Sequence, residues 1–193
     1  MAMNVLHRWL CGSPAWARKV REQLLPWALD GADLGGNVLE VGPGYGATTA
    51  VLAERVERLT ALEVDPVLAG RLRAGLPGAV RVVEGDGAAM PLPEDEFSAV
   101  VCFTVLHHVP TPAGQDRLFA EAHRVLRPGG VLAGSDSIVT LRFRLLHVGD
   151  TMVPVDPDTL PDRLAAAGFT GIEVDRVAGR SFRFRARKPA RPA

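Results

Sequence analysis

The sequence is poor in cysteine and in aromatic residues, and neither sign of charge is in excess. Its only cysteines, Cys11 and Cys102, allow at most one disulfide and cannot hold a structural zinc without help from the five histidines. The 22 acidic and 22 basic residues cancel at pH 7, which removes whole-molecule attraction to nucleic acid or to an anionic membrane. No run of about 18 apolar residues is present, so we expect no membrane-spanning helix.

The amino-terminal segment lacks the pattern of a secretory signal. Arg8 falls inside what would be its apolar region, and further basic residues follow at Arg18, Lys19 and Arg21. Together with the scarcity of cysteine, this favours a reducing compartment. We therefore expect a cytoplasmic protein, with neither membrane nor nucleic acid as a partner, and we assign no metal ligands.

The composition is that of one folded domain. Apolar residues make up 47% of the 193 residues and charged residues 23%, and a chain of this length can bury roughly 70% of its unfolded surface. From Asn37 onward, short β-rich apolar runs alternate with helical periodicity, the pattern of a parallel sheet covered by helices on both faces. Strands are expected at 37–41, 58–63, 80–84, 98–103 and 131–135, helices at 47–56, 66–75, 113–126 and 156–167, and a hairpin at 172–177 and 182–187.

The fold class follows from this order. It is α/β, with a doubly wound, mostly parallel seven-stranded sheet of Rossmann-like type and a C-terminal antiparallel hairpin. A turn at Arg127-Pro128-Gly129-Gly130 should separate the preceding helix from the strand at 131–135. The stretch 137–155 has no clean period.

The domain organisation has three parts. Residues 1–36 form a helical extension, 37–188 the sheet domain, and 189–193 a frayed tail. A helix over Pro14–Leu29 would place Ala17, Val20, Leu24 and Trp27 on one stripe. This extension is either an extra layer packed on the fold or a lid over a substrate cleft, and both interpretations stay open.

Candidate binding residues stand at successive strand ends. The turn Gly42-Pro43-Gly44-Tyr45-Gly46 joins a strand to a helix, where backbone N–H groups favour the anionic part of a ligand. Glu63 ends the second strand, where a carboxylate can accept both ribose hydroxyls of an adenosine-containing cofactor. Asp86 ends the third strand and could accept from an exocyclic amine. Ligands of open α/β sheets bind beyond the carboxyl ends of the strands, so these groups should converge.

These segments together resemble the class I S-adenosylmethionine-dependent methyltransferases of small molecules. The resemblance spans about residues 37–136 and rests on four motifs in order. They are Val38–Gly46 (VLEVGPGYG), Leu62–Pro66 (LEVDP), Glu84–Ala88 with Met90–Pro93 (EGDGA and MPLP), and Arg124–Gly130 (RVLRPGG).

The resemblance implies S-adenosylmethionine as the cofactor and a role for each matching residue. Gly42, Gly44 and Gly46 would let the backbone approach the methionine part, and Glu40 would lie near its ammonium group. Glu63 would hold the ribose, Asp86 the adenine amine with Gly87 beside it, and Phe103 and Thr104 would line the floor below the sulfonium. Other roles stay open for these residues. Glu40 could tie down the glycine loop, Asp86 could cap the next helix, and Glu63 could pair with an arginine. Phe103 and Thr104 could form part of the wall of the site without contacting the cofactor.

Catalysis of methyl transfer requires mainly alignment and exclusion of water, because attack on a sulfonium is downhill. Positioning of this kind can be worth roughly 7–11 kcal/mol. His107 and His108 follow the fourth strand, and His147 with Asp150 lies in the non-periodic stretch, where a histidine oriented by a carboxylate would make a base. For all three histidines a structural role is the alternative.

Three other functions are compatible with parts of the sequence. Gly42, Gly44 and Ala47 also satisfy a dinucleotide fingerprint, but the only tyrosine, Tyr45, lies in the glycine turn, which argues against a short-chain nicotinamide-dependent oxidoreductase. Ribosomal RNA adenine dimethyltransferases are similar in the first two motifs, but Cys102-Phe103-Thr104-Val105 departs from their base-gripping tetrapeptide. A catalytically inactive cofactor-binding protein is the third. We expect methyl transfer to a small organic acceptor, with oxygen slightly favoured; the oligomeric state is open.

Overall fold

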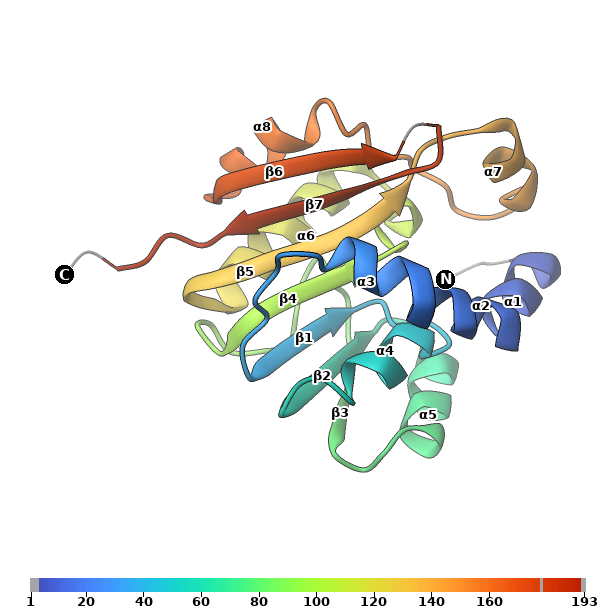
Figure 1. The fold of residues 1–193 in the computed structure, drawn as a ribbon, viewed down its shortest axis with the longest axis horizontal. Helices are drawn as coiled ribbons and strands as arrows, with labels where there is room; N and C mark the ends of the chain where they lie inside the picture. The colour runs from blue at the N-terminus through green and yellow to red at the C-terminus, as the bar shows by residue number, and fades with distance from the viewer. Residues whose placement is uncertain (1–3, 178, 192–193) are drawn as a thin grey trace.

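The structure, a computed structural model that describes residues 4–177 and 179–191, is built on one seven-stranded sheet (Figure 1). The strand order is β3-β2-β1-β4-β5-β7-β6. The first five strands pair in parallel, and β7 is antiparallel to both β5 and β6. This confirms the predicted fold class. The strands are β1 (Asn37–Val41), β2 (Arg58–Glu63), β3 (Val80–Glu84), β4 (Phe97–Phe103), β5 (Leu126–Ser137), β6 (Thr170–Val177) and β7 (Ser181–Arg187).

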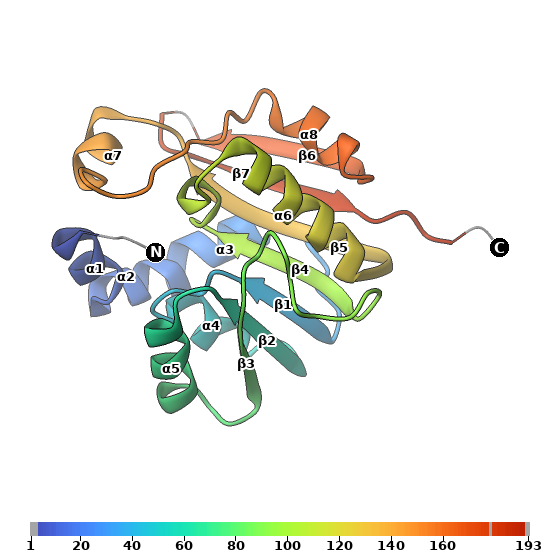
Figure 2. The same ribbon diagram turned by 180° about the vertical axis from the view of Figure 1, so that it is seen from behind.

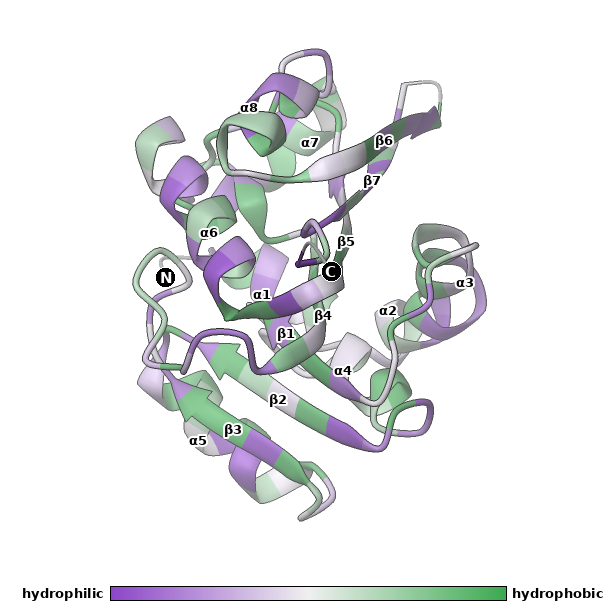
Figure 3. Ribbon diagram, turned by 90° about the vertical axis from the view of Figure 1, so that its left-hand side faces the viewer, coloured by the Kyte–Doolittle hydropathy of each residue, from purple (hydrophilic) through white to green (hydrophobic). Residues whose placement is uncertain are grey.

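Helices cover both faces of the sheet. Figure 2 shows α6 (Pro112–Val125) and α8 (Leu160–Ala166) over one face, and Figure 1 shows α3 (Leu25–Ala28) and α4 (Ala47–Leu52) over the other. Figure 3, which looks at the layers from the side, shows the same separation. Each face has its own apolar core. Because both faces are covered, β4 at the centre of the sheet is buried along its whole length. The remaining crossover helix, α5 (Pro66–Gly75), packs on β2 and β3.

The amino-terminal helix differs from the prediction in which side chains it buries. Residues 14–28 form one helical run, α2 (Pro14–Lys19), the π-helical segment η1 (Val20–Leu24) and α3. A π turn adds a residue to the turn and rotates the following face. Val20, Leu25 and Ala28 are therefore buried, whereas the predicted stripe would have used Ala17 and Leu24. A further helix, α1 (Val5–Cys11), precedes this run and was not predicted.

The predicted turn at 127–130 was wrong, because strand β5 already begins at Leu126. Leu126 pairs with Phe97, and the next pair is Val131 with Ala99, so the four intervening residues form a bulge within the strand. Lys188 closes this bulge: its carbonyl accepts from the Gly129 N–H and its own N–H donates to the Gly130 carbonyl.

Several other boundaries moved. Helix α4 ends at Leu52 and α8 begins at Leu160, where Pro161 occupies its first turn. The non-periodic stretch contains a short helix, α7 (Leu141–Leu146). The hairpin alternates as predicted: Phe182 and Phe184 are buried, and Arg183 and Arg185 pair with Asp175 and Glu173 of β6. In the predicted tail, Arg191 binds Asp95, and residues 192 and 193 lie outside the described residues. None of the described helices has the length and apolarity needed to cross a membrane.

Candidate functional site

The glycine loop after β1 holds its backbone open toward the carboxyl ends of the strands. Gly42, Gly44 and Gly46 all have left-handed φ angles of +69°, +57° and +81°. A Cβ on Gly42 would lie 2.2 Å from Val105 Cγ2, whereas a Cβ on Gly44 would meet no atom within 4 Å. Gly42 is therefore required by packing, and Gly44 faces open space where a ligand could approach its backbone.

Glu63, at the end of β2, is buried and fastens this loop. Its Oε2 accepts from the Gly44 N–H at 3.0 Å, and its Oε1 accepts from the Asp65 N–H at 3.0 Å. The Asp65 carboxylate in turn caps α5 by accepting from Val67 N–H and Leu68 N–H. Each carboxylate oxygen has a second lone pair, so Glu63 can still accept from a ligand hydroxyl in the cavity that it lines.

Glu40, in β1, is buried beneath the loop and does not line the cavity. Its Oε1 accepts from the hydroxyl of Thr48, which does line the cavity. Its Oε2 has no hydrogen-bond partner among the described residues. Burial, only partly offset by hydrogen bonding, raises the pKa of Glu40 to about 7. The carboxyl is thus a buried acid, separated from the ligand space by one side chain.

A cavity of about 260 Å³ opens between the ends of β1, β2 and β3. Asp86 and Gly87 form one wall, and the other side chains around it are mainly apolar, among them Leu62 and Leu118. Asp86 is exposed, and its Oδ1 accepts from the Ala88 N–H at 2.8 Å. The turn after β3 is therefore held by the same carboxylate that faces the cavity.

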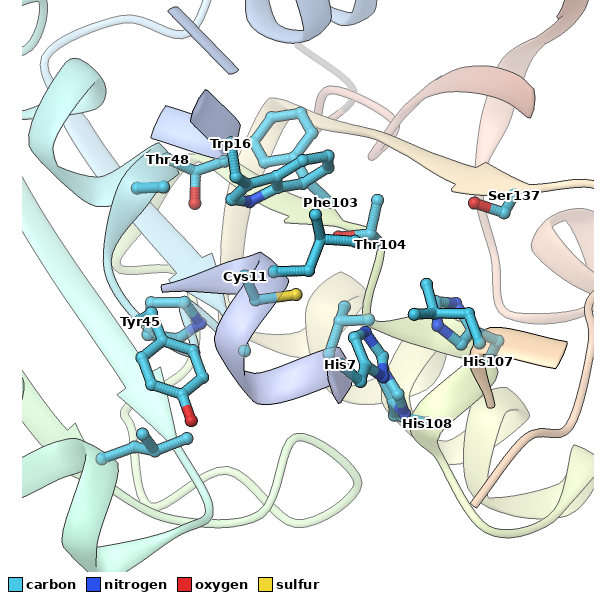
Figure 4. Close-up of a pocket in the computed structure, with 18 of the residues that line it drawn as sticks. His7, Cys11, Trp16, Tyr45, Thr48, Phe103, Thr104, His107, His108 and Ser137 are labelled. Atoms are coloured by element: carbon cyan, nitrogen blue, oxygen red, sulfur yellow. The ribbon is translucent and has the colours of Figure 1, made fainter. Parts of the chain in front are cut away.

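A second cavity, of about 270 Å³, adjoins the first, and Gly42, Val105 and His108 line both. Phe103 and Thr104, at the end of β4, lie on its wall (Figure 4). Thr104 has a φ of +53°, an unusual conformation for a β-branched residue.

The wall of the second cavity away from the glycine loop carries four of the five histidines. His107 follows β4, and its Nδ1 lies 2.5 Å from the Oδ1 of Asp136, at the end of β5. The other oxygen of Asp136 accepts from the His107 backbone N–H at 3.0 Å. Both residues are buried, so the carboxylate fixes the orientation of the ring.

The predicted pairing of His147 with Asp150 was wrong. Nδ1 of His147, just after α7, donates to the Phe143 carbonyl at 2.8 Å, and Asp150 accepts from Nδ1 of His7 in α1 at 2.7 Å. His108 Nδ1 lies 3.2 Å from the Thr151 carbonyl. Burial lowers the pKa of His147 and lowers that of His108 to about 3, which keeps these two rings neutral.

The pattern of strand-end acids around a glycine loop has a counterpart among known families. The model of the methyltransferase domain matches residues 39–134, from β1 to β5. The chain belongs to the class I S-adenosylmethionine-dependent methyltransferases.

The chain is 36% identical over 153 residues to a probable S-adenosylmethionine-dependent methyltransferase of Mycolicibacterium smegmatis; the match covers 75% of this chain and 55% of that protein. It is 34% identical over 177 residues to the chloroplastic 2-methyl-6-phytyl-1,4-hydroquinone methyltransferase 1 of Oryza sativa subsp. japonica, which covers 87% of this chain and 51% of the relative. The chain thus spans about half the length of these two curated relatives.

A solved structure of similar fold is the N-methyltransferase NodS from Bradyrhizobium japonicum in complex with S-adenosyl-L-homocysteine. It has a TM-score of 0.71 and 23% identity, and covers 94% of this chain and 91% of that chain. At this identity the likeness concerns the fold alone.

Most residues selected from the sequence gather at these two adjoining cavities. Glu63, Gly42, Gly44, Phe103 and Thr104 line one of them, and Asp86 with Gly87 lines the other. Glu40 and Gly46 line neither, and Gly46 instead packs against Leu72 of α5. The sequence did not indicate three features of the site: the presence of His7, the presence of Asp136, and the hydrogen bond from His7 to the Asp150 carboxylate. Only the position of Asp136 at a strand end could have indicated its place.

Proposed function

We propose that the chain transfers a methyl group from S-adenosylmethionine to a small organic acceptor by in-line displacement. Support comes from the two cavities that meet at Gly42, Val105 and His108. The cavity beside Asp86 offers a carboxylate that can accept from an exocyclic amine. The other cavity offers the accessible backbone of Gly44, the Glu63 carboxylate for the ribose hydroxyls, and space for a second molecule. Catalysis rests mainly on holding donor and acceptor in line and excluding water, which can be worth roughly 7–11 kcal/mol.

In this proposal the cofactor lies across both cavities. The adenine occupies the cavity beside Asp86 and Gly87, and the ribose hydroxyls donate to Glu63. The methionine part lies over Gly42 and Gly44, with Gly46 positioning α4 behind it. Glu40 acts through Thr48, and its buried carboxyl faces the positive end of the ligand. The sulfonium then lies at Phe103 and Thr104.

The acceptor occupies the remainder of the second cavity, between α1, α7 and the end of β4. Its wall is partly apolar, with Leu10, Trp16, Phe143 and Leu146 around the histidines. These side chains suit a small, partly hydrophobic molecule. A hydroxyl acceptor is favoured, since the cavity also offers a base.

His107 is the base in this proposal, and Asp136 is its positioning residue. His107 lines the cavity, and the 2.5 Å contact holds its Nδ1 on the carboxylate. His107→Asn should lower kcat by about 100-fold to 10,000-fold, with the affinity for S-adenosylhomocysteine unchanged. Asp136→Asn should lower kcat with KM for the cofactor unchanged. A matched control is His123→Asn, because His123 is the one histidine that lines neither cavity.

The decisive experiment is a calorimetric titration of the purified chain with S-adenosylhomocysteine and, separately, with NAD and NADP. We expect binding of S-adenosylhomocysteine alone. A mass-spectrometric assay with S-adenosylmethionine and a panel of phenols, amines and thiols then tests turnover. Binding of NAD in place of S-adenosylhomocysteine would contradict the proposal, and cofactor binding with no product from any acceptor would favour an inactive cofactor-binding protein.

A further inference from the structure

Three histidines from distant parts of the chain direct their side chains to one point on the wall of the second cavity. They are His7 in α1, His108 in the 3-10 turn η2 (Leu106–His108) and His147 after α7. Each offers a ring nitrogen, and these three nitrogens all lie within 4.8 Å of one another. All three side chains are buried, and Figure 4 shows the rings of His7 and His108 beside each other.

We propose that His7, His108 and His147 bind a divalent transition-metal ion, with zinc as the preferred ion, through their Nε2 atoms. Imidazole nitrogens are suitable ligands for zinc, and three protein ligands with an open fourth position are typical of zinc sites that take a substrate.

The hydrogen bonds of the three rings are those of metal ligands. In each ring Nδ1 is held by an oxygen: Asp150 Oδ2 for His7 at 2.7 Å, the Phe143 carbonyl for His147 at 2.8 Å, and the Thr151 carbonyl for His108 at 3.2 Å. An oxygen acceptor on one nitrogen fixes the tautomer that leaves the lone pair on the other. Asp150 with His7 is also the carboxylate–histidine pair commonly found behind a metal.

The spacing needs only a small adjustment. Tetrahedral zinc with Zn–N bonds of about 2.0–2.1 Å places its ligand nitrogens about 3.3 Å apart. Atoms within 4.8 Å of one another therefore have to approach by at most about 1.5 Å, which rotation of the rings and a shift of α1 can supply.

One contact competes with the ion. His147 Nε2, which keeps its lone pair because Nδ1 donates to the Phe143 carbonyl, lies 3.2 Å from Nε2 of His107. A metal ion would take over this lone pair. Replacing His107 should therefore leave the metal site intact or strengthen it, which sets His107 apart from the three ligands.

The ion would have two effects. It would link α1 to α7 and η2, and so close the amino-terminal extension over the cavity. Its open position would face the space assigned to the acceptor and would hold an oxygen, nitrogen or sulfur atom of that molecule. This second role rests on the proposed function, whereas metal binding itself does not.

The test uses the full chain without a histidine tag, stripped with a chelator and titrated with ZnCl₂ in a calorimeter. We expect one zinc per chain, a higher melting temperature with zinc, and visible absorption of a four-coordinate site with Co²⁺. His7→Asn, His108→Asn and His147→Asn should each weaken zinc binding by at least about tenfold. His123→Asn and His107→Asn should retain it.

The outcomes separate this inference from the proposed function. Absence of stoichiometric zinc binding in the wild-type chain, or equal zinc affinity in the wild type and His147→Asn, would overturn the metal site. Titration of the same variants with S-adenosylhomocysteine provides the second readout. Zinc binding without S-adenosylhomocysteine binding would leave the metal site standing and refute the proposed function.

Discussion

The buried carboxyl of Glu40 provides a prediction in which stability and pH are linked. Burial raises the pKa of Glu40 from 4.5 to about 7. Between these values the folded chain binds a proton that the unfolded chain does not, so the free energy of unfolding falls as the pH rises through this window. Well above pH 7 the carboxyl is ionised in both states, and its burial then lowers the free energy of unfolding by at most about 3 kcal/mol.

Glu40→Gln removes the titration while keeping the shape of the side chain. Its amide oxygen can still accept from the Thr48 hydroxyl that binds Glu40. At pH 8 we expect Glu40→Gln to unfold with a free energy about 1–3 kcal/mol above that of the wild type, and at pH 5 the difference should be about 2 kcal/mol smaller. The gain in stability should come with weaker binding of S-adenosylmethionine, because the negative charge beneath the loop is lost.

The measurement is urea unfolding followed by circular dichroism at pH 5 and pH 8, with the difference between wild type and variant compared at the two values. Glu22→Gln, at an exposed glutamate of the amino-terminal helix, is the matched control and should show no pH-dependent difference. An equal effect of Glu40→Gln at both pH values, or a larger gain at pH 5, would refute the assignment of a raised pKa to this carboxyl.

Other predictions concern the loops around the cavities. Gly42→Ala should lower the free energy of unfolding by about 2–4 kcal/mol, because its Cβ would lie 2.2 Å from Val105 Cγ2. Gly44→Ala should lower it by only about 1–2 kcal/mol, the strain of a positive φ, but should weaken the binding of S-adenosylhomocysteine. Equal stabilities of the two variants in urea would contradict the packing argument. Asp86→Ala should raise the Kd for S-adenosylhomocysteine by about 5-fold to 150-fold, and an unchanged Kd in calorimetry would exclude Asp86 from the adenine site. Thr104→Gly should raise the urea midpoint by relieving about 1 kcal/mol of strain at φ +53°; a lower midpoint would show that the threonine side chain contributes more to packing than its backbone costs.

The parts of the fold that the sequence predicted best are those with local signals. Strands β1, β2 and β3 have the bounds predicted for them, because each apolar run ends at a glycine, an aspartate or a proline turn. Strand β5 was predicted too short, since a Pro-Gly-Gly turn and a bulge inside a strand have the same local sequence. The π turn at η1 has no local signal either, and it moved the buried face from Leu24 to Leu25.

The placement of Glu63 and Asp86 at adjoining cavities could be predicted from the sequence, because the carboxyl ends of parallel strands meet at one edge of the sheet. The histidine cluster could not. His7 is held by Asp150, 143 residues later, and His107 by Asp136, 29 residues later. These pairings depend on how α1 and α7 lie at the cavity, and no periodicity or motif carries that information. Proximity along the chain instead suggested Asp150 for His147, whose ring takes a backbone carbonyl.

A crystal structure of the chain with S-adenosylhomocysteine is the most direct test of how the two cavities are used. We predict the adenine ring beside Asp86, the ribose hydroxyls on Glu63, and the sulfur atom at Phe103 and Thr104, facing the wall that carries the histidines. An adenosyl group bound away from Asp86 and Glu63, or a sulfur atom that side chains separate from His107, would contradict this prediction.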